Sequence, residues 1–467
     1  MRVPARIYAT KQMLPEISHD KTLEQLINIT TLPGIVSHAI VMPDAHEGYG
    51  FPIGGVAAFD LEQGIISPGG IGYDINCGVR LLKSSLTKDE LQPYLEKLGP
   101  ALYNQIPSGV GKGGQLKLSN TDLNRILKHG AQQAVKLGYG NPGDLEHLES
   151  KGKLDHADPN TVSQYAKNRG RDQLGTMGAG NHFVEIDFID QIFDQTTAGR
   201  LGLSLNQICI LIHTGSRGLG HQIATDYIRL MVRSLNHYQI QLPDRELACA
   251  PFNSPEGQQY FSAMSCGANF AWANRQLITH HVRTVWQKVL GIQQAQLEII
   301  YDVAHNIAKV ESYPVQPHLT SPLAKERNSP SFQKRGLGGV NNYQLLIHRK
   351  GATRAFPNQP VIIPGSMGTA SYLLIGQKKS LTASFGSSCH GAGRRMSRRQ
   401  AIRDINPDQL LNQLQSQGIH ITAGSLRGMA EEAPQAYKDV DQVVDTIQLA
   451  GIANKVARLK PLAVIKG

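Results

Sequence analysis

Apolar side chains recur with helical spacing in one long segment of the chain. The segment begins with Ser254, Pro255 and Glu256, an order typical of a helix start, with a capping hydroxyl, a first-turn proline and an acid near the positive end of the helix. The apolar positions recur at intervals of three, four or seven residues and are Phe261, Met264, Ala268, Ala271, Ile278, Val282, Val285 and Val289. Because glycine favours the conformation that closes a helix, we expect this helix to stop at Gly291.

Four short apolar runs have the β-branched content and the Gly, Pro or polar boundaries that are typical of strands. They cover residues 208–212, 297–301, 360–364 and 372–375, and a second helix is expected over 221–229. Residues 312–342 are rich in Pro, Ser and Lys and form the one credible surface insertion. Since no linker divides the chain, we expect a single large domain of α+β class over residues 1–467.

Composition and charge favour a soluble globular protein with an anionic partner. The 467 residues are 40% hydrophobic and 18% charged, which fits a large core. The 47 Lys and Arg residues outnumber the 37 Asp and Glu residues, and the net charge of +10 favours a partner such as nucleic acid. Aromatic residues make up only 6%, which argues against binding single strands mainly by base stacking.

Targeting and redox signals point to the cytoplasm. The N-terminus lacks the pattern of a secretory signal, and no apolar run approaches the about 20 residues needed to cross a bilayer. The cysteines are scattered without CxxC spacing, at Cys77, Cys209, Cys249, Cys266 and Cys389. We therefore expect free thiols in a reducing, cytoplasmic setting and no membrane attachment.

A glycine-rich loop over residues 69–79, GGIGYDINCGV, holds an acid and a thiol three residues apart. So many glycines indicate unusual dihedral angles or close backbone approach. Asp74 and Cys77 are thereby presented on a tightly bent loop as two potential metal ligands. A cysteine is most often a small buried hydrophobe, but Cys77 lies beside an acid and not in an apolar stripe.

Three histidines share a position at the ends of expected strands, where rigid scaffolds present functional groups. His213 ends the apolar run at 208–212, His305 follows the run at 297–301, and His182 lies between a glycine turn and a strand-like run. Any one of them alone is more often a hydrogen-bonded structural residue. Together with Asp74 and Cys77 they suit either zinc or a two-metal site for phosphoryl chemistry.

Three further glycine loops suit phosphate or nucleotide. Residues 214–220 enter the expected helix and include Arg217, although a plain strand-to-helix turn explains them equally well. Residues 364–371 join two expected strands. In the third loop, over 386–399, His390 is followed by GAG and four arginines, so an imidazole nucleophile could stand beside a polyanion site. The alternative for that loop is a solvated basic helix face with an incidental histidine.

These segments, in this order, closely resemble the RtcB-type RNA-splicing ligases. The resemblance covers almost the whole chain and rests on nine motifs: PDAHEGYGFPIGG (43–55), GGIGYDINCGVR (69–80), GAGNHFVE (178–185), HTGSRGLGHQ (213–222), YDVAHN (301–306), HRKGATRAF (348–356), PGSMGTAS (364–371), CHGAGR (389–394) and the terminal VIKG. It implies mixed sheets around a central metal and nucleotide cleft, with peripheral helices.

The resemblance also implies a reaction. A GTP- and manganese-dependent ligase of this type joins an RNA 3′-phosphate, or a 2′,3′-cyclic phosphate after its hydrolysis, to a 5′-hydroxyl. By the match in CHGAGR, His390 is the residue that attacks the α-phosphate of GTP and becomes guanylylated. GMP then passes to the RNA 3′-phosphate, and the 5′-hydroxyl displaces it. The substrates would be tRNA halves or broken RNA ends, and an archease-type activator is a possible partner.

The family's binding residues map onto this chain one by one. Asp74, Cys77 and His182 would hold one manganese ion, and Cys77, His213 and His305 the other, with Cys77 shared. The guanine nucleotide set is Asn181, His182, Phe183, Val184, Glu185, His305, Asn306, Pro364, Gly365, Ser366, Met367, Ser371, His390, Gly391, Ala392, Gly393, Tyr437 and Lys466. Glu185 and Lys466 would read the guanine edge, and Tyr437 would stack or pack beside it.

Two other functions compete with ligation. A two-metal RNA phosphodiesterase would use the same metal ligands but would need neither His390 nor GTP. A non-catalytic RNA-binding protein would use only the positive charge and would bind RNA in a salt-sensitive way.

Overall fold

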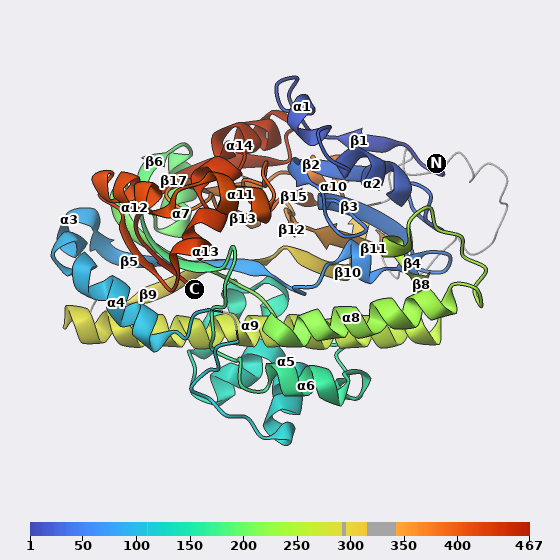
Figure 1. The fold of residues 1–467 in the computed structure, drawn as a ribbon, viewed down its shortest axis with the longest axis horizontal. Helices are drawn as coiled ribbons and strands as arrows, with labels where there is room; N and C mark the ends of the chain where they lie inside the picture. Colours follow the sequence, from blue (N-terminus) through green and yellow to red (C-terminus); the bar gives the residue numbers. More distant parts are fainter. Residues whose placement is uncertain (110, 292–295, 315–341) are drawn as a thin grey trace.

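Two β-sheets form the centre of the fold in the computed structural model, which describes residues 1–109, 111–291, 296–314 and 342–467 (Figure 1). The larger sheet has the strand order β13–β14–β17–β6–β7–β5–β9, with β16 paired to β17. Its strands are β5 (Gly78–Thr87), β6 (Phe183–Ile192), β7 (Gln207–Thr214), β9 (Leu297–Ala304), β13 (Pro360–Ile363), β14 (Ser371–Gly376), β16 (His420–Ala423) and β17 (Ala453–Lys466). Every pairing in it is antiparallel except the parallel pair β16–β17.

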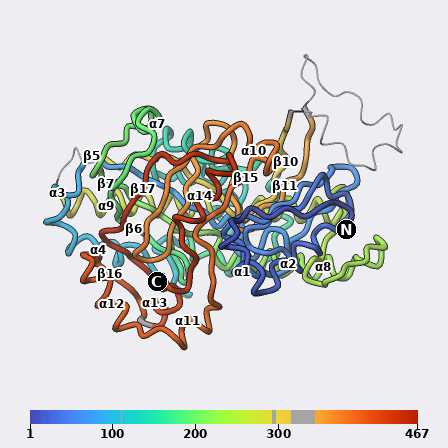
Figure 2. The backbone as a smooth tube through the Cα atoms, turned by 90° about the horizontal axis from the view of Figure 1, so that it is seen from above, coloured from blue at the N-terminus to red at the C-terminus, as the bar shows by residue number. Residues whose placement is uncertain are grey.

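The second sheet has five strands in the order β1–β2–β3–β11–β10. They are β1 (Ala5–Ile7), β2 (Ala39–His46), β3 (Ile53–Asp60), β10 (Asn306–Pro314) and β11 (Asn342–Lys350). Two small sheets pair β12 (Ala352–Arg354) with β15 (Ser387–Cys389), and β4 (Ile65–Ile66) with β8 (Ala250–Pro251). Viewed from above, the N-terminal strands and α2 lie at one end of the molecule, and β5, β7 and β17 lie at the other (Figure 2).

Helices surround the sheets. They are α1 (Leu14–Ile17), α2 (Thr22–Ile29), α3 (Lys88–Leu91), α4 (Leu95–Gln105), α5 (Asn120–Lys136), α6 (Gln164–Gly170), α7 (Gln195–Leu201), α8 (Arg217–Ser234), α9 (Pro255–Leu290), α10 (Ser380–Ala383), α11 (Arg398–Asp404), α12 (Pro407–Ser416), α13 (Leu426–Glu431) and α14 (Val440–Leu449). Figure 1 shows α9 running below the sheets, with α8 beside it and α5 and α6 on its far side.

The long helix α9 confirms the predicted caps. The Ser254 hydroxyl accepts a hydrogen bond from the Gly257 amide, and Gly291 closes the helix with a φ of 63°. We predicted one buried face, and the structure corrects this, because α9 is buried nearly all round through its middle. Its buried polar residues, including Asn274 and Arg275, are therefore available to support loops of the neighbouring sheet.

The other predicted elements are also present. The four apolar runs fall in β7, β9, β13 and β14, with Pro364 just beyond the end of β13, and the α+β class is confirmed. The helix predicted over 221–229 starts earlier, at Arg217. Of the predicted insertion, residues 312–314 belong to β10 and residue 342 to β11, and the stretch between them lies outside the described residues. The extent of the domain, 1–467, stays a prediction.

Both faces of the larger sheet are buried, which fixes the register of its strands and therefore where their ends lie. Val184 and Ile186 of β6 pack in the same apolar cluster as Trp272 of α9. On the opposite face, Phe183 packs in a second cluster that also contains Leu211 of β7. Because β6, β7, β5 and β9 are held side by side in register, polar residues at their ends meet at one edge of the sheet.

Candidate active site

The glycine-rich loop before β5 is folded back against the start of β10. The Asn76 amide donates to the Asn306 carbonyl at 2.7 Å, and the His305 amide donates to the Cys77 carbonyl at 2.7 Å. Asn76 itself has a φ of 52°. A Cβ atom on Gly78 would lie 2.3 Å from the Val303 carbonyl oxygen, so only glycine allows β9 to approach this closely. The loop's glycines thus permit the close backbone approach that the sequence indicated.

Three predicted metal ligands lie at the same edge of the sheet because of strand register. Phe183, which follows His182, pairs with His213, and His213 also pairs with Val79 of β5. Gly78 pairs with Ala304, which precedes His305. The ends of β6, β7 and β9 therefore bring three histidines to the start of β5, where Cys77 lies.

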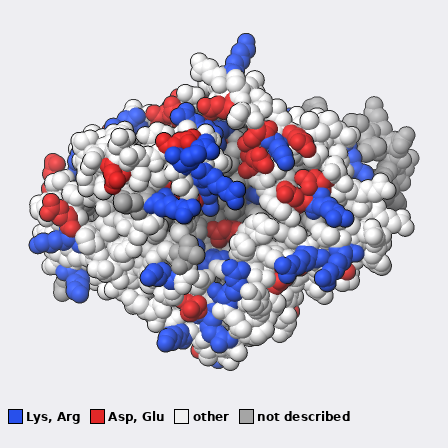
Figure 3. All heavy atoms as spheres, in the orientation of Figure 1, with Lys and Arg blue, Asp and Glu red and all other residues white. Residues whose placement is uncertain are grey.

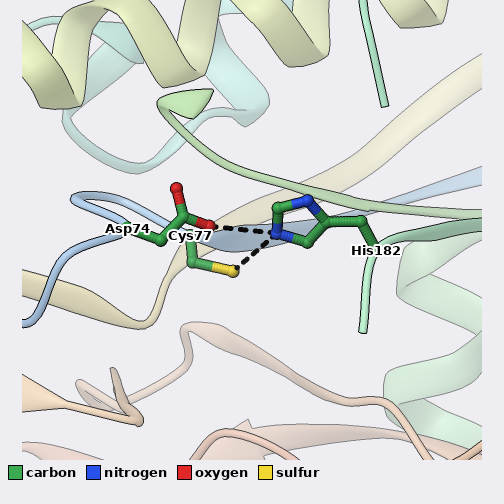
Figure 4. A group of neighbouring side chains, drawn as sticks. All are labelled: Asp74, Cys77 and His182. Carbon is green, nitrogen blue, oxygen red and sulfur yellow. Dashed lines mark hydrogen bonds and ion pairs between the residues drawn. The ribbon is translucent and has the colours of Figure 1, made fainter. Parts of the chain in front are cut away.

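Cys77 lies at the centre of this group. Its Sγ is 3.5 Å from Nε2 of His182 and 3.3 Å from Nε2 of His213. An Asp74 carboxylate oxygen is 3.0 Å from the same His182 nitrogen, and Figure 4 shows Asp74 and Cys77 both directed at it. The ligand atoms of Asp74, Cys77 and His182 all lie within 4.8 Å of one another, which fits a shared cation.

His305 completes the group from its other side. Its ring centroid is 5.4 Å from that of His213. Both of its ring nitrogens are buried and have no hydrogen-bond partner among the described residues. A buried imidazole without partners is costly unless a ligand satisfies it, so this orphaned ring fits the second ion predicted here.

The local electrostatics suit cation binding. Burial, reinforced by the neighbouring His182, lowers the pKa of His213 well below its usual value, and burial beside His390 does the same to the pKa of His305. Although burial opposes ionisation of Asp74, the hydrogen bond with His182 brings its pKa to about 2. Burial and the Asp74 charge raise the pKa of the Cys77 thiol, so thiolate formation here requires a compensating cation.

His390 stands next to this group, with its ring centroid 5.3 Å from that of His305. Its Nδ1 lies 2.6 Å from Oδ2 of Asp44, a fully buried carboxylate of β2, and its backbone amide donates to the same oxygen at 3.0 Å. A Cβ atom on Gly393 would lie 2.1 Å from the Asp44 carbonyl oxygen, so glycine is required for the GAG loop to approach β2. An Nδ1–H donated to Asp44 leaves Nε2 with a free lone pair.

A cleft of about 680 Å³ opens in front of His390, between the two large sheets. Most of the predicted nucleotide residues line it: Asn181, Phe183, Glu185, Pro364, Gly365, Ser366, Met367, His390, Gly391, Ala392, Gly393, Tyr437 and Lys466. His213 lies at the same wall. Lys466 is the last residue of β17, so a strand holds it at the cleft.

The other predicted nucleotide residues support the cleft wall without lining it. Val184 points into the core below β6. The Ser371 hydroxyl accepts from the Gly365 amide at 3.0 Å and so braces the loop over 364–371. Asn306 joins the Asp74 carbonyl to the Gly351 amide, at 3.1 and 2.8 Å. His182 and His305 belong to the metal group.

Arginines border the cleft together with acidic residues. Arg394, Arg395 and Arg398 line it, and Figure 3 shows Lys and Arg side chains gathered around a hollow near the middle of this face. The Arg394 guanidinium lies over the Tyr437 ring, 4.9 Å from its centroid, so Tyr437 stacks on an arginine.

The loop over 214–220 has a role different from the phosphate cradle suggested by its glycines. Among the described residues, the cleft lining includes none of 214–220. The Ser216 amide instead donates to Asp74 Oδ1 at 3.0 Å, and a guanidinium nitrogen of Arg217 lies 3.1 Å from Nδ1 of His182. This loop therefore positions two candidate metal ligands.

Two residues near His390 received no role from the sequence. Asp44 is an acid inside an apolar strand, and a single charged residue within an apolar stretch of sequence is the signal that could have identified it. Lys438 is buried beneath it, and its ammonium group donates to the carbonyls of Pro43 and Ala45 on either side of Asp44. Lys438 lies two residues before α14, and a lysine at such a position carries no such signal.

The class of protein that this site fits is an enzyme acting on phosphates. It combines a carboxylate–thiol–imidazole group whose thiol and imidazole are buried, an oriented imidazole with a free nitrogen and a cleft bordered by arginines.

Comparison with known proteins gives the family. Residues 25–467 match the family described as "tRNA-splicing ligase RtcB", and the chain belongs to that family. A tRNA-splicing ligase RtcB of Thermococcus kodakarensis is 50% identical over the whole chain and 95% of the relative. One from Archaeoglobus fulgidus is 46% identical with the same coverage, and an RNA-splicing ligase RtcB homolog 1 of Entamoeba dispar is 44% identical over 98% of this chain and 84% of the relative.

Proposed function

We propose that this protein is an RNA ligase that joins 3′-phosphate or 2′,3′-cyclic phosphate ends to 5′-hydroxyl ends, in tRNA splicing, RNA repair or both. The proposal rests above all on the place of His390, whose Nδ1 is held by Asp44 while its ring stands against the Cys77 group. The names of the relatives and the family match support the same activity.

The chemistry of His390 follows from that hydrogen bond. With the proton on Nδ1, the Nε2 lone pair attacks the α-phosphate of GTP, forming an N–P bond as the P–O bond to pyrophosphate breaks. An RNA 3′-phosphate oxygen then displaces the imidazole and takes the GMP. The 5′-hydroxyl finally attacks the activated phosphate, loses its proton and releases GMP. A cyclic phosphate end is first opened by hydrolysis.

Asp74, Cys77 and His182 would hold one manganese ion, and Cys77, His213 and His305 a second. The donor set fits, since two imidazoles are held neutral, the carboxylate is ionised and neither ring nitrogen of His305 has a hydrogen-bond partner among the described residues. When bound, such ions neutralise phosphate charge and orient a leaving group. The softness of these ligands suits zinc equally well, so the choice of manganese is itself part of what we propose.

Base and RNA recognition are assigned to different parts of the cleft. Glu185 and Lys466 lie on the neighbouring strands β6 and β17, with an acceptor and a donor available for the guanine edge. The arginines at 394, 395 and 398 would contact phosphates of the RNA ends.

The setting we propose is the cytoplasm, with RNA and GTP as substrates and an archease-type protein as a possible activator. All five cysteines are buried free thiols, which suits a reducing compartment. No described helix is long and apolar enough to span a bilayer.

A ligation assay tests the proposal. Two RNA oligonucleotides, one ending in a 3′-phosphate and the other beginning with a 5′-hydroxyl, are incubated with the protein, GTP and manganese. We expect a joined product that requires GTP and that His390→Ala abolishes, while His237→Ala, at an exposed position, keeps it. Cleavage of RNA without GTP, unaffected by His390→Ala, would indicate a phosphodiesterase instead. RNA binding without turnover would indicate a non-catalytic protein.

A further inference from the structure

A second carboxyl group lies behind the proposed guanine-reading residue. Glu185 and Asp187 are two positions apart in β6, so their side chains project from the same face of the sheet. Cross-strand partners confirm that face: Leu211 lies opposite Glu185 and Cys209 opposite Asp187, and both partners belong to one apolar cluster. Glu185 lines the cleft, whereas Asp187 lies two residues farther along β6 and is not among the described residues that line it.

Asp187 is buried in this layer without a compensating hydrogen bond from the described residues. Its side chain is 1% exposed, and neither carboxyl oxygen has a hydrogen-bond partner among the residues that the structure describes. A lone ionised carboxylate in such a place is expensive, so the group favours its neutral form. Burial raises the pKa of Asp187 to about 8, and burial together with the charge of Asp187 raises the pKa of Glu185.

Few other charges reach the pair. From β17, the cation that acts on Glu185 is Lys466, whose own surroundings include Glu432, Glu431 and Arg398. From β7, Cys209 faces Asp187 with a raised thiol pKa, because of burial and the Asp187 charge, and Lys83 of β5 lies beyond it. His213 is at the cleft end of β7. Because Lys466 is a single cation at the cleft end of the pair, it favours one negative charge shared between the Glu185 and Asp187 carboxyl groups.

We propose that Asp187 limits guanine affinity by competing with Glu185 for the single negative charge that this buried layer accommodates. A carboxylate at Glu185 accepts hydrogen bonds from the N1–H and amino group of guanine, whereas a protonated Glu185 loses part of this capacity. When Asp187 carries the charge, Glu185 keeps its proton and the base is bound weakly. The inference rests on the proposed function, because it takes the cleft as a guanine site.

The sign of the pH effect follows from this competition. At low pH both carboxyls are protonated, and removing Asp187 leaves the ionisation of Glu185 unchanged. As the pH rises through about 8, Asp187 ionises and holds Glu185 protonated. A variant without this carboxyl escapes the competition, so its guanine affinity continues to rise with pH while that of the wild type levels off.

Calorimetric titration with GMP between pH 6 and 9 tests the proposal without turnover. For an Asp187 group that titrates near pH 8, we expect Asp187→Asn to bind GMP as tightly as the wild type at pH 6, and more tightly by up to about fourfold at pH 8.5 and about tenfold at pH 9. Asp187→Leu, which fills the apolar layer, should behave like Asp187→Asn. Asp190→Asn is the matched control, because Asp190 lies on the same strand but is paired with Arg458 and Lys460.

The outcomes distinguish the proposed competition between the two carboxyl groups from the proposed guanine site on which it rests. Parallel pH profiles for the wild type, Asp187→Asn and Asp187→Leu would overturn the competition, as would weaker binding by both variants at every pH. A wild-type protein that binds neither GMP nor GTP would overturn the proposed guanine site itself. Divergence of the profiles only above pH 7.5, absent in Asp190→Asn, is the result that supports the inference.

Discussion

Replacing Asp44 with asparagine should slow guanylylation far more than it weakens nucleotide binding. Asp44 Oδ2 holds the His390 ring through Nδ1 at 2.6 Å and its backbone amide at 3.0 Å. The substitution keeps the shape but removes the charge. Asp44 is not among the described residues that line the cleft, so GTP affinity should change by less than about threefold.

The magnitude comes from the lost charge-assisted bond. Hydrogen bonds to charged groups contribute about 1.5–3 kcal/mol, which corresponds to a rate loss of about 10- to 150-fold if the ring is only less well oriented. If the new amide nitrogen turns toward Nδ1, the ring proton must move to Nε2 and the nucleophilic lone pair is lost. Losses of about 10⁴-fold accompany such a tautomer change in catalytic histidines.

The assay follows formation of the protein–GMP adduct from GTP labelled at the α-phosphate, under single-turnover conditions. We expect Asp44→Asn to be between about 10 and about 10⁴ times slower than the wild type at saturating GTP. Asp445→Asn, which breaks an exposed ion pair with Lys455, should be unchanged within about threefold. A wild-type rate in Asp44→Asn, with a folded protein, would refute the orienting role of this carboxylate.

Three other predictions concern metal binding, support of the nucleophile and stability. Cys77→Ala should lose bound manganese and guanylylation together, whereas Cys249→Ala, at a buried thiol in the core, should keep both; unchanged metal content in Cys77→Ala by native mass spectrometry would remove its shared role. Lys438→Met should lower the maximal rate of adduct formation by about tenfold with little change in GTP affinity, because the Lys438 ammonium fixes the carbonyls that flank Asp44. An equal loss of rate in Lys455→Met would show that the effect is not local to Asp44. Burial lowers the pKa of His348 to about 3, so below pH 6.5 the unfolded chain binds more protons than the folded protein, and the free energy of unfolding falls as the pH drops. His348 alone should lower the free energy of unfolding by about 2 kcal/mol at pH 5 relative to pH 7. Denaturant titrations that show an equally steep fall in His348→Gln would contradict this.

Sequence patterns predicted those parts of the fold that local chemistry determines. The caps of α9 at Ser254 and Gly291 follow from a hydroxyl and a left-handed glycine, which act within a few residues. The strand ends that carry His213 and His305 were marked by apolar runs followed by polar loops, and His182 was marked by a glycine turn before a strand-like run. Their convergence could be suspected from this shared placement, but only the register of β6, β7, β5 and β9 brings them to Cys77.

Other features depend on tertiary contacts that no local pattern reveals. Arg217 suggested a phosphate contact because it lies in a glycine-rich loop that enters a helix, yet it opens α8 and contacts His182. Asp44 and His390 are 346 residues apart, so their hydrogen bond is a consequence of β2 meeting the GAG loop. The buried state of α9 on nearly every side could not be read from a 3.6-residue period, because its polar residues point to loops and not to water.

The most direct test of the account is to locate the GMP group after incubation with GTP and manganese. Peptide mapping under neutral conditions should place one GMP per protein on the peptide that contains His390, as an adduct that is labile in acid and stable in alkali. An adduct on a lysine such as Lys466, or one that persists in His390→Ala, would contradict the central claim that this oriented imidazole is the nucleophile.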